Sequence, residues 1–203
     1  MSDRGVLIIL SGPSGSGKDT VLNKLVDGRD DVCVSVSMTT RAKRDGEIDG
    51  KHYYFVNREY FEKKIGEGKM LEYAEYAHNY YGTPREPVEE MLRAGKSVIL
   101  KIEVQGAEKI RKIFPDVTSI FLLPPSMRVL EERLRGRGSE DEETLHHRLV
   151  IAREELRRAY DYDYVVINDT VESAVKGIEI VIAAENKKTA RNKNLISEVI
   201  DNV

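Results

Sequence analysis

The chain alternates between short apolar runs and longer segments of mixed polarity. Mainly apolar runs of strand length occupy residues 6–10, 97–102, 118–123 and 164–167, and an alternating run occupies residues 32–38. Segments with helical periodicity separate most of these runs. Strands that alternate with helices predict right-handed crossovers and a parallel sheet that is covered on both sides. We therefore expect an α/β fold with a doubly wound parallel sheet of about five strands.

Residues 37–84 interrupt this alternation with a pattern of their own. The segment is rich in tyrosine and consists of short alternating runs separated by glycines, with a helix expected at residues 58–65 behind the N-cap residue Asn57. We interpret it as a small subdomain inserted into one domain. The segments of this single domain of residues 1–203 are a core of residues 1–36, 85–135 and 149–185, the insertion 37–84, a lid 136–148 and a tail 186–203.

The lid and the tail are interpreted from composition. Residues 136–148 are charged and punctuated by glycines, which is typical of a mobile flap but equally of a solvated loop. The tail is rich in lysine and arginine and is expected to be solvated or to fray.

The first apolar run leads into a glycine-rich turn, residues 12–17, which Lys18 and a helical segment follow. Glycines permit backbone conformations that a Cβ atom would forbid, so successive N–H groups can converge on phosphate oxygens at the positive end of the helix. The spacing matches the P-loop pattern up to Lys18, but Asp19 replaces the usual hydroxyl residue and Thr20 follows one place later. A tight strand–helix connection is the plainer alternative. We interpret residues 12–20 as a phosphate cradle for a nucleotide.

Composition and charge restrict the possible functions. The net charge of −3 and the isoelectric point of about 5.9 provide no overall basic field for nucleic acid. The single cysteine, Cys33, is interpreted as a small buried residue. No apolar run approaches the roughly 20 residues of a membrane span, and the N-terminus lacks a signal-peptide pattern. We expect a cytoplasmic enzyme without nucleic-acid or membrane partners, and the sequence leaves its oligomeric state open.

Further motifs follow the cradle along the chain. They are Ser35-Val36-Ser37, Thr39-Thr40-Arg41 with Arg44 and Gly46-Glu47, Asn79-Tyr80-Tyr81-Gly82-Thr83, Val104-Gln105-Gly106-Ala107, Pro124-Pro125-Ser126 and Arg137-Gly138-Ser139-Glu140. With these motifs the chain resembles the guanylate kinases, P-loop nucleoside monophosphate kinases that phosphorylate GMP from ATP. The resemblance runs from Gly5 to about Ala184. It implies a doubly wound core, an inserted GMP-binding region, a lid, and a role in purine nucleotide metabolism and GMP recycling.

The resemblance also implies roles for individual residues. The expected ATP-binding residues are Gly12, Pro13, Ser14, Gly15, Ser16, Gly17, Lys18, Asp19, Thr20, Arg133, Arg137 and Asn168. The expected GMP-binding residues are Ser37, Arg41, Arg44, Tyr53, Glu72, Tyr81, Thr83 and Glu103. The residues expected to position and neutralise the transferred phosphoryl group are Lys18, Arg41, Arg44, Arg137 and Arg148. Because the accepting phosphate oxygen is largely ionised at neutral pH, no general base is required.

The chemistry of guanine gives Glu72 a specific role within this set. Guanine has an acceptor at O6 and donors at N1 and N2, so a site that reads its edge needs a carboxylate and a hydroxyl. Glu72 and Ser37, with Thr83 nearby, occupy the matching positions, and adenine would place a lone pair against Glu72. Apart from the resemblance, Glu72 would be one of many surface acids. GMP and dGMP are the expected acceptors.

The expected cofactor is Mg²⁺ bound together with ATP, and Thr20 rather than Asp19 is expected to support the metal. Two residues near the third strand of the pattern depart from the family: Lys101 stands where an acid is usual, and Glu103 stands where Asp is frequent. Two assignments have alternatives. Arg133 could pair with Glu131 or Glu132, and Asn168-Asp169 could cap the last helix.

Two other functions fit the same fold. One is a kinase of another phosphorylated small molecule, such as a ribose bisphosphate, which would not need a base-reading Glu72. The other is a guanylate-kinase-like module that binds protein partners without catalysis, which would be expected to have lost the P-loop or the lid arginines. Glu72 and the intact cradle favour the kinase of GMP.

Overall fold

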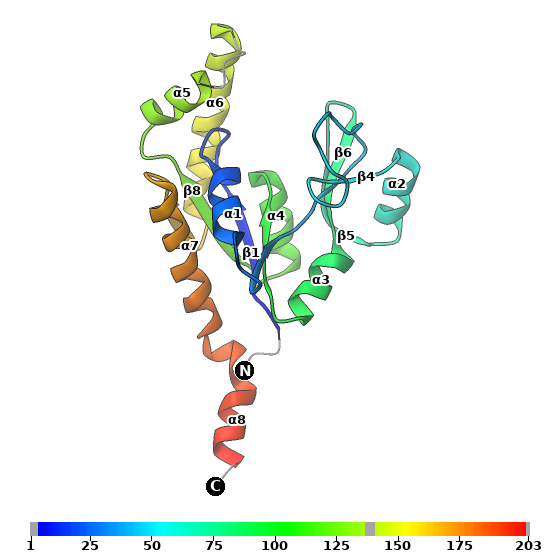
Figure 1. Cartoon of the computed structure of the whole chain (residues 1–203), viewed down its shortest axis with the longest axis vertical. Coiled ribbons are helices and arrows are strands. Elements are labelled where there is room, and N and C mark those ends of the chain that lie inside the picture. The colour runs from blue at the N-terminus through cyan, green and yellow to red at the C-terminus, as the bar shows by residue number, and fades with distance from the viewer. Residues whose placement is uncertain (1–3, 137–140, 202–203) are drawn as a thin grey trace.

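The computed structural model describes residues 4–136 and 141–201 and has a five-stranded sheet at its centre, in the order β2–β7–β1–β8–β9 (Figure 1). The strands are β1 (Leu7–Ser11), β2 (Val32–Val34), β7 (Ser97–Lys101), β8 (Thr118–Leu123) and β9 (Tyr164–Ile167). Every neighbouring pair is parallel. The α/β fold with a parallel sheet of five strands is therefore confirmed.

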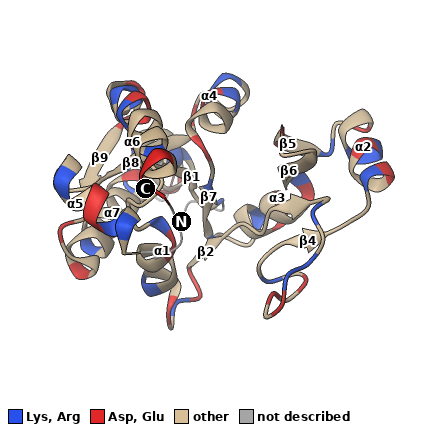
Figure 2. Ribbon diagram, turned by 90° about the horizontal axis from the view of Figure 1, so that it is seen from above, with Lys and Arg blue, Asp and Glu red and all other residues tan. Residues whose placement is uncertain are grey.

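Helices cover both faces of this sheet, because successive side chains of a strand point to opposite sides. Ile8 and Leu10 of β1 pack with α1 (Lys18–Val26) and α7 (Val171–Asn186). Leu7 and Ile9 pack on the other face, with α3 (Arg85–Arg93) and α4 (Val104–Ile113). Figure 2 shows the sheet between α4 and the pair formed by α1 and α7. The strands are thus buried on both faces, which explains their continuous apolar runs.

The parallel arrangement determines where polar side chains meet. All five strands run in the same direction, so the residues that follow them lie at one edge of the sheet. The phosphate cradle follows β1, Ile102 and Glu103 follow β7, and Asn168 follows β9. This edge is where the site is built.

A second sheet of four strands, in the order β4–β3–β6–β5, lies within residues 38–84. Its elements are β3 (Met38–Thr39), β4 (Tyr54–Phe55), α2 (Arg58–Gly66), β5 (Met70–Tyr76) and β6 (Asn79–Pro84). Helix α2 packs on it through Phe61, which is buried between Met38 and Met70. The Asn57 side chain accepts a hydrogen bond from the Tyr60 N–H, so the predicted N-cap is confirmed.

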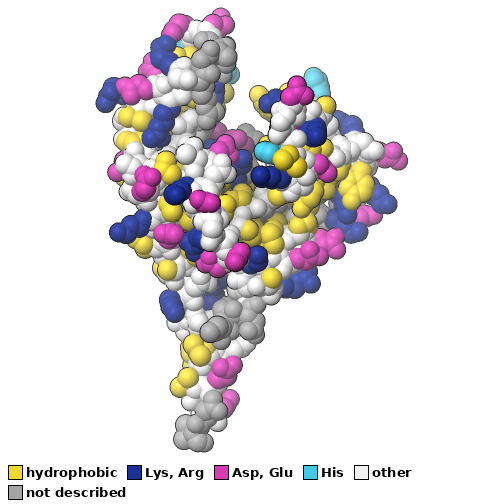
Figure 3. Space-filling view, viewed as in Figure 1, with side chains coloured by type: hydrophobic (Ala, Val, Ile, Leu, Met, Phe, Trp, Pro, Cys, Tyr) yellow, Lys and Arg dark blue, Asp and Glu magenta, His cyan; other side chains and the backbone are white. Residues whose placement is uncertain are grey.

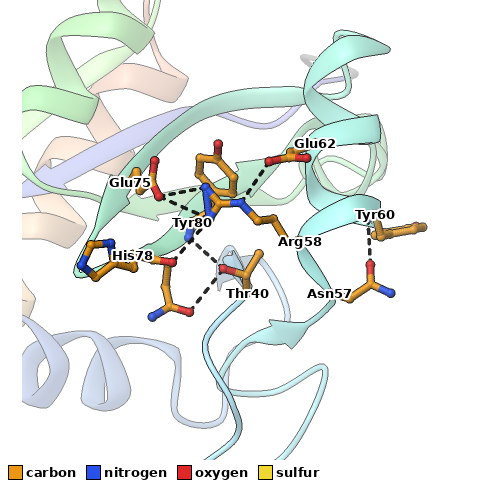
Figure 4. Close-up of polar contacts among 9 residues, drawn as sticks. Thr40, Asn57, Arg58, Tyr60, Glu62, Glu75, His78 and Tyr80 are labelled. Atoms are coloured by element: carbon orange, nitrogen blue, oxygen red, sulfur yellow. Dashed lines mark hydrogen bonds and ion pairs between the residues drawn. The ribbon is translucent and has the colours of Figure 1, made fainter.

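Arg58 joins α2 to the hairpin of β5 and β6 (Figure 4). Its guanidinium lies over the Tyr80 ring, 4.3 Å from the ring centroid, and donates hydrogen bonds to Glu62 and Glu75. The hairpin turns through Ala77 and His78, which both have positive φ. Exposed ion pairs add little stability, but the guanidinium stacked on Tyr80 and bonded to Glu75 links α2 to the hairpin.

The expected single strand at residues 32–38 is wrong. Val32–Val34 pairs with β7 in the parallel sheet, and the Ser35 N–H still donates to the Ile99 carbonyl. Met38 and Thr39 instead pair with β4 and β6 of the second sheet. The alternation of apolar residues continues through both parts because each sheet has a buried face. The chain therefore changes sheets where a continuous strand was predicted.

Two helices form an arm beside the core, α5 (Met127–Arg135) and α6 (Glu142–Arg157), which pack together through Leu130, Leu134, Leu145 and Ala152. In Figure 3 an open hollow separates this arm from the part of the molecule that carries the second sheet. Residues 142–148 of the expected lid form the first turns of α6. Arg137, with residues 138–140, lies outside the described residues.

The end of the chain is helical. The short 3-10 helix η1 (Arg158–Asp161) follows α6, and a second one, η2 (Thr189–Arg191), follows α7. Beyond η2, α8 (Lys193–Asp201) extends away from the core with all of its residues exposed (Figure 1). The tail, which was predicted to be solvated or to fray, is solvated over these residues and also helical, and the Leu195, Ile196, Val199 and Ile200 side chains of the helix are exposed. No helix of the described residues is both long and apolar enough to cross a membrane.

Candidate active site

The backbone of the phosphate cradle depends on Gly17, which precedes the first residue of α1. Gly17 has φ of 91°, in the left-handed region that disfavours side chains, and a Cβ atom there would lie 2.4 Å from Asn168 Nδ2. Asn168 is buried, and its Nδ2 donates to the Ser16 carbonyl over 2.7 Å. The end of β9 therefore holds the turn that presents the cradle N–H groups.

Arg133 of α5 supports the same turn. Its guanidinium donates to the Asn168 carbonyl over 2.9 Å and to the Ser16 carbonyl over 3.4 Å. The alternative pairing with a helical neighbour is wrong. Glu131 and Glu132 accept hydrogen bonds from other arginines of α5.

The alternative role of Asn168-Asp169 as a helix cap is also wrong. Helix α7 is capped by Thr170, whose hydroxyl accepts from the Ser173 N–H over 3.1 Å. The Asp169 carboxylate accepts from the Thr170 N–H, one residue outside the helix.

Lys18 lies within the cradle and interacts with several carboxylates. Its Nζ donates to the Gly12 carbonyl and, over 3.2 Å, to the Pro13 carbonyl. Burial lowers the pKa of Lys18, while Glu103, Glu155 and Asp19 oppose that shift. The ammonium group is therefore already positioned in the loop that would surround a phosphate.

Helix α6 contributes Arg148 and Glu155 to the cradle. Arg148 Nη2 donates to the Ser14 hydroxyl over 2.7 Å, and the Glu155 carboxylate lies close enough to the Ser14 backbone N–H for that group to favour its charged form. Burial, and then the nearby Glu103 carboxylate, raises the pKa of Glu155. Glu155 is not among the site residues predicted from the sequence. A signal was present, because Arg148 and Glu155 are spaced to share one face of α6 with the buried Ala152.

Asp19 and Lys101, the two departures from the expected pattern, form an ion pair with Nζ and Oδ1 2.6 Å apart. Asp19 is on the first turn of α1, and Lys101 ends β7, the strand that pairs with β1. Both side chains are accessible, with 70% of the Asp19 side chain and 39% of the Lys101 side chain exposed. Thr20, the next residue of α1, is also exposed.

On the second sheet, Arg41 is held by Glu47. The two side chains form a pair of hydrogen bonds of 2.7 and 3.0 Å, and both are mostly buried. The Arg44 backbone N–H donates to the same carboxylate, whereas the Arg44 side chain is exposed. The hydrogen bonds from Arg41 and from the Arg44 N–H lower the pKa of Glu47 to about 2. Arg41 is therefore charged and oriented before any ligand arrives.

Two tyrosines surround the Arg41 guanidinium. Its central carbon lies 5.5 Å from the centroid of the Tyr53 ring, and Tyr81 interacts with the same guanidinium. The two rings meet edge to face, with centroids 6.2 Å apart. Arg41, Tyr53 and Tyr81 thus lie together. Ser37 lies half-buried just before β3, where its carbonyl accepts from the Tyr54 N–H.

Glu72 and Thr83, on neighbouring strands of the second sheet, form a carboxylate–hydroxyl pair in which Thr83 Oγ1 donates to Glu72 Oε1 over 2.7 Å. Glu72 Oε2 lies so near the start of α4 that a Cβ on Gly106 would be 3.1 Å from it. Burial raises the pKa of Glu72, although the hydrogen bond from Thr83 opposes this shift. Glu72 is therefore not an ordinary surface acid.

The described residues of the candidate site thus form two groups. The cradle, Arg133, Arg148 and Asn168 gather at the carboxyl end of the parallel sheet, whereas Arg41, Tyr53, Tyr81, Glu72 and Thr83 lie on the second sheet. Glu103 follows β7, and its carboxylate is near enough to Lys18 and Glu155 to shift the pKa of both. In the cradle, Ser16 Oγ and Asn168 Oδ1 are buried and have no hydrogen-bond partner among the described residues, so both are available to a bound polar group.

Comparisons with known proteins agree with this arrangement. The family model described as guanylate kinase matches residues 4–185. A guanylate kinase of Synechocystis sp. is 50% identical over 184 residues, which are 91% of this chain and 96% of that protein. One of Shouchella clausii is 47% identical over 199 residues, covering 98% and 97%. The crystal structure of guanylate kinase from Anaplasma phagocytophilum has a TM-score of 0.74 and 40% identity, and the match covers 93% of this chain and 89% of that one. The chain, an α/β kinase with a P-loop, belongs to the guanylate kinase family.

Proposed function

We propose that the protein transfers a phosphoryl group from ATP to GMP, giving ADP and GDP, and that dGMP is a second acceptor. The observation that carries this proposal is the Glu72–Thr83 pair, a shielded carboxylate with a hydroxyl beside it. Guanine, with donors at N1 and N2, matches the carboxylate, whereas adenine would place a lone pair against it. A kinase of sugar phosphates would have no use for this pair.

The ATP phosphates would bind in the cradle. The N–H groups at the start of α1 and the Lys18 ammonium supply positive charge there, and Arg133 and Arg148 reach the same loop from α5 and α6. Transfer between two phosphates requires in-line positioning and neutralisation of charge. For positioning and charge neutralisation we propose four residues of the described part of the chain, Lys18, Arg41, Arg44 and Arg148. Arg137 is a further candidate.

The acceptor phosphate would bind to the Arg41 guanidinium, with the Tyr53 and Tyr81 hydroxyls as additional donors. Support comes from the orientation of Arg41 by Glu47 and from the two tyrosine rings around it. Ser37 and the exposed side chain of Arg44 are proposed to complete the GMP contacts. The two nucleotides would face one another across the hollow, and closure of residues 136–148 would exclude water as an acceptor.

Mg²⁺ is the proposed cofactor, and the donor set fits it. No group of three or more potential ligands of the His, Cys, Asp or Glu type forms a ready cage among residues 4–136 and 141–201. Mg²⁺ in kinases usually takes one or two carboxylates besides phosphate oxygens and water. The adjacent Glu103 and Glu155 carboxylates and the Thr20 hydroxyl are the proposed protein groups near it. When bound, the ion would neutralise charge on the ATP phosphates.

Substitution of Glu72 by glutamine tests base recognition. The change keeps the shape but replaces an acceptor with a donor that faces guanine N1–H or N2–H. We expect kcat/KM for GMP to fall by a factor that corresponds to about 1–3 kcal/mol, while discrimination against AMP weakens. A coupled assay of ADP release with GMP, dGMP, AMP and ribose phosphates as acceptors measures both quantities.

Glu75→Gln is the matched control. Glu75 lies three residues further along β5, which places its side chain on the opposite face, and it binds Arg58 (Figure 4). We expect this variant to retain the GMP kinetics of the wild type. An unchanged kcat/KM for GMP in Glu72→Gln, or a preference of the wild type for ribose phosphates, would contradict the proposed function.

The affinity for GMP should depend on the protonation of Glu72. Its pKa lies above the ordinary value of 4.5 because the group is buried, and only the charged form accepts from both guanine donors. GMP binding should therefore weaken as the pH falls through this raised pKa. The phosphate of GMP itself titrates near pH 6, so the informative quantity is the ratio of the wild-type and Glu72→Gln affinities, measured by calorimetry across pH. A ratio that stays constant down to pH 4.5 would contradict this prediction.

A further inference from the structure

The ion pair between Asp19 and Lys101 joins two residues that each look unfavourable alone. Asp19 places a carboxylate on the first turn of α1, beside the loop that would hold a triphosphate, where negative charges repel. Lys101 places an ammonium group at the carboxyl end of β7, where P-loop enzymes usually have an acid that helps to hold Mg²⁺. The two side chains meet at 2.6 Å.

Stability does not explain this pair. Both side chains are accessible, and exposed pairs of this kind typically contribute less than about 1 kcal/mol. The position is the distinctive feature. The pair joins the first turn of α1 to the end of β7, the strand that lies beside β1 with Lys101 next to Leu10, and both charges act on Lys18 within the cradle.

We propose that Asp19 and Lys101 act as one unit. In this unit a carboxylate stands on α1 where P-loop enzymes usually have a hydroxyl, and an ammonium group stands at the end of β7 where they usually have an acid. Lys101 neutralises the Asp19 carboxylate and thereby permits the ATP phosphates to bind in the cradle, so Lys101 is a positioning residue that acts through Asp19. In this arrangement neither residue is required for its own sake. Lys101 is required only because the Asp19 carboxylate is present. The inference rests on the proposed binding of ATP in the cradle.

A double-mutant cycle tests this coupling. Calorimetry gives the ATP dissociation constant of the wild type, Lys101→Met, Asp19→Ser and the double variant, with Mg²⁺ and with a chelator instead. In Lys101→Met the Asp19 charge is no longer neutralised by the lysine, and we expect ATP to bind about five- to tenfold more weakly, more so at low salt. Asp19→Ser should bind ATP at least as tightly as the wild type. The double variant should recover to within about twofold of the wild type.

Three controls make the cycle specific. GMP binding, at the second sheet, should stay unchanged in all four proteins. Lys112→Met removes an equivalent charge from the exposed Glu108 pair on α4 and should leave ATP binding unaltered. Lys101→Arg keeps the charge and should bind ATP nearly as the wild type does, and thermal unfolding verifies that each variant is folded.

Several results would overturn the inference. If Lys101→Met binds ATP normally, Asp19 needs no neutralisation. If the double variant is as weak as Lys101→Met, Lys101 acts on ATP directly and not through Asp19. A loss in Lys101→Arg as large as in Lys101→Met would exclude a role of the charge. Failure of the wild type itself to bind ATP would instead refute the proposed function, so the two failures are distinguishable.

Discussion

Replacement of Lys18 by methionine is expected to lower kcat by about 10²- to 10³-fold, the usual effect of removing one fixed charge from a phosphoryl-transfer or oxyanion site. The Lys18 ammonium is already held in the cradle by the Gly12 and Pro13 carbonyls, so it would meet the phosphates without reorganisation. Methionine keeps much of the side-chain volume and removes the charge. ADP release at saturating ATP and GMP measures the effect.

Lys24→Met is the matched control for this variant. Lys24 is exposed in the last turn of the same helix, so the substitution removes an equal charge from α1 at its other end. We expect its kcat to equal that of the wild type. If Lys18→Met kept its kcat within about twofold of the wild type, the cradle would not be the site of transfer.

Replacement of Arg41 by methionine is expected to lower kcat/KM for GMP by about 10²-fold, mainly through KM, because hydrogen bonds between charged groups are the strong ones. The loss has a second cause. Without its partner, the Glu47 carboxylate would face the incoming GMP phosphate and repel it. The KM for ATP, for which the cradle is the proposed site, should not change and serves as an internal reference.

Glu47→Gln separates the two contributions to this effect. Arg41 remains charged in that variant but loses the ionic partner that orients it, so we expect a smaller loss than in Arg41→Met. An Arg41→Met variant with the GMP KM of the wild type would show that the phosphate binds elsewhere, for example at the exposed Arg44.

The sequence determined those features that depend on neighbouring residues. The strands at residues 118–123 and 164–167 begin and end where their apolar runs do, and Asn57 caps α2 as its position before the helix predicts. The glycines of the cradle were interpretable for the same reason, since a turn followed by Lys18 restricts the backbone locally. Hydrophobic periodicity and turn chemistry are local properties, and they suffice to predict such elements.

The sequence did not determine which strands pair. The alternation through Val34 and Met38 is continuous, yet Val34 lies in the parallel sheet and Met38 in the second one. Alternation shows that a strand has one buried face, but the partner that satisfies its backbone hydrogen bonds can be anywhere in the chain.

Only the tertiary structure decided how the site residues are supported. Asp19 and Lys101 are 82 residues apart, Asn168 is 152 residues from the Ser16 carbonyl that it holds, and Glu155 reaches the cradle from a separate arm. In the sequence each of these residues is an ordinary polar side chain on a helix or at a strand end. They meet because the crossovers of a parallel sheet bring the carboxyl ends of distant strands to one edge, and that order results from packing both faces of the sheet against helices.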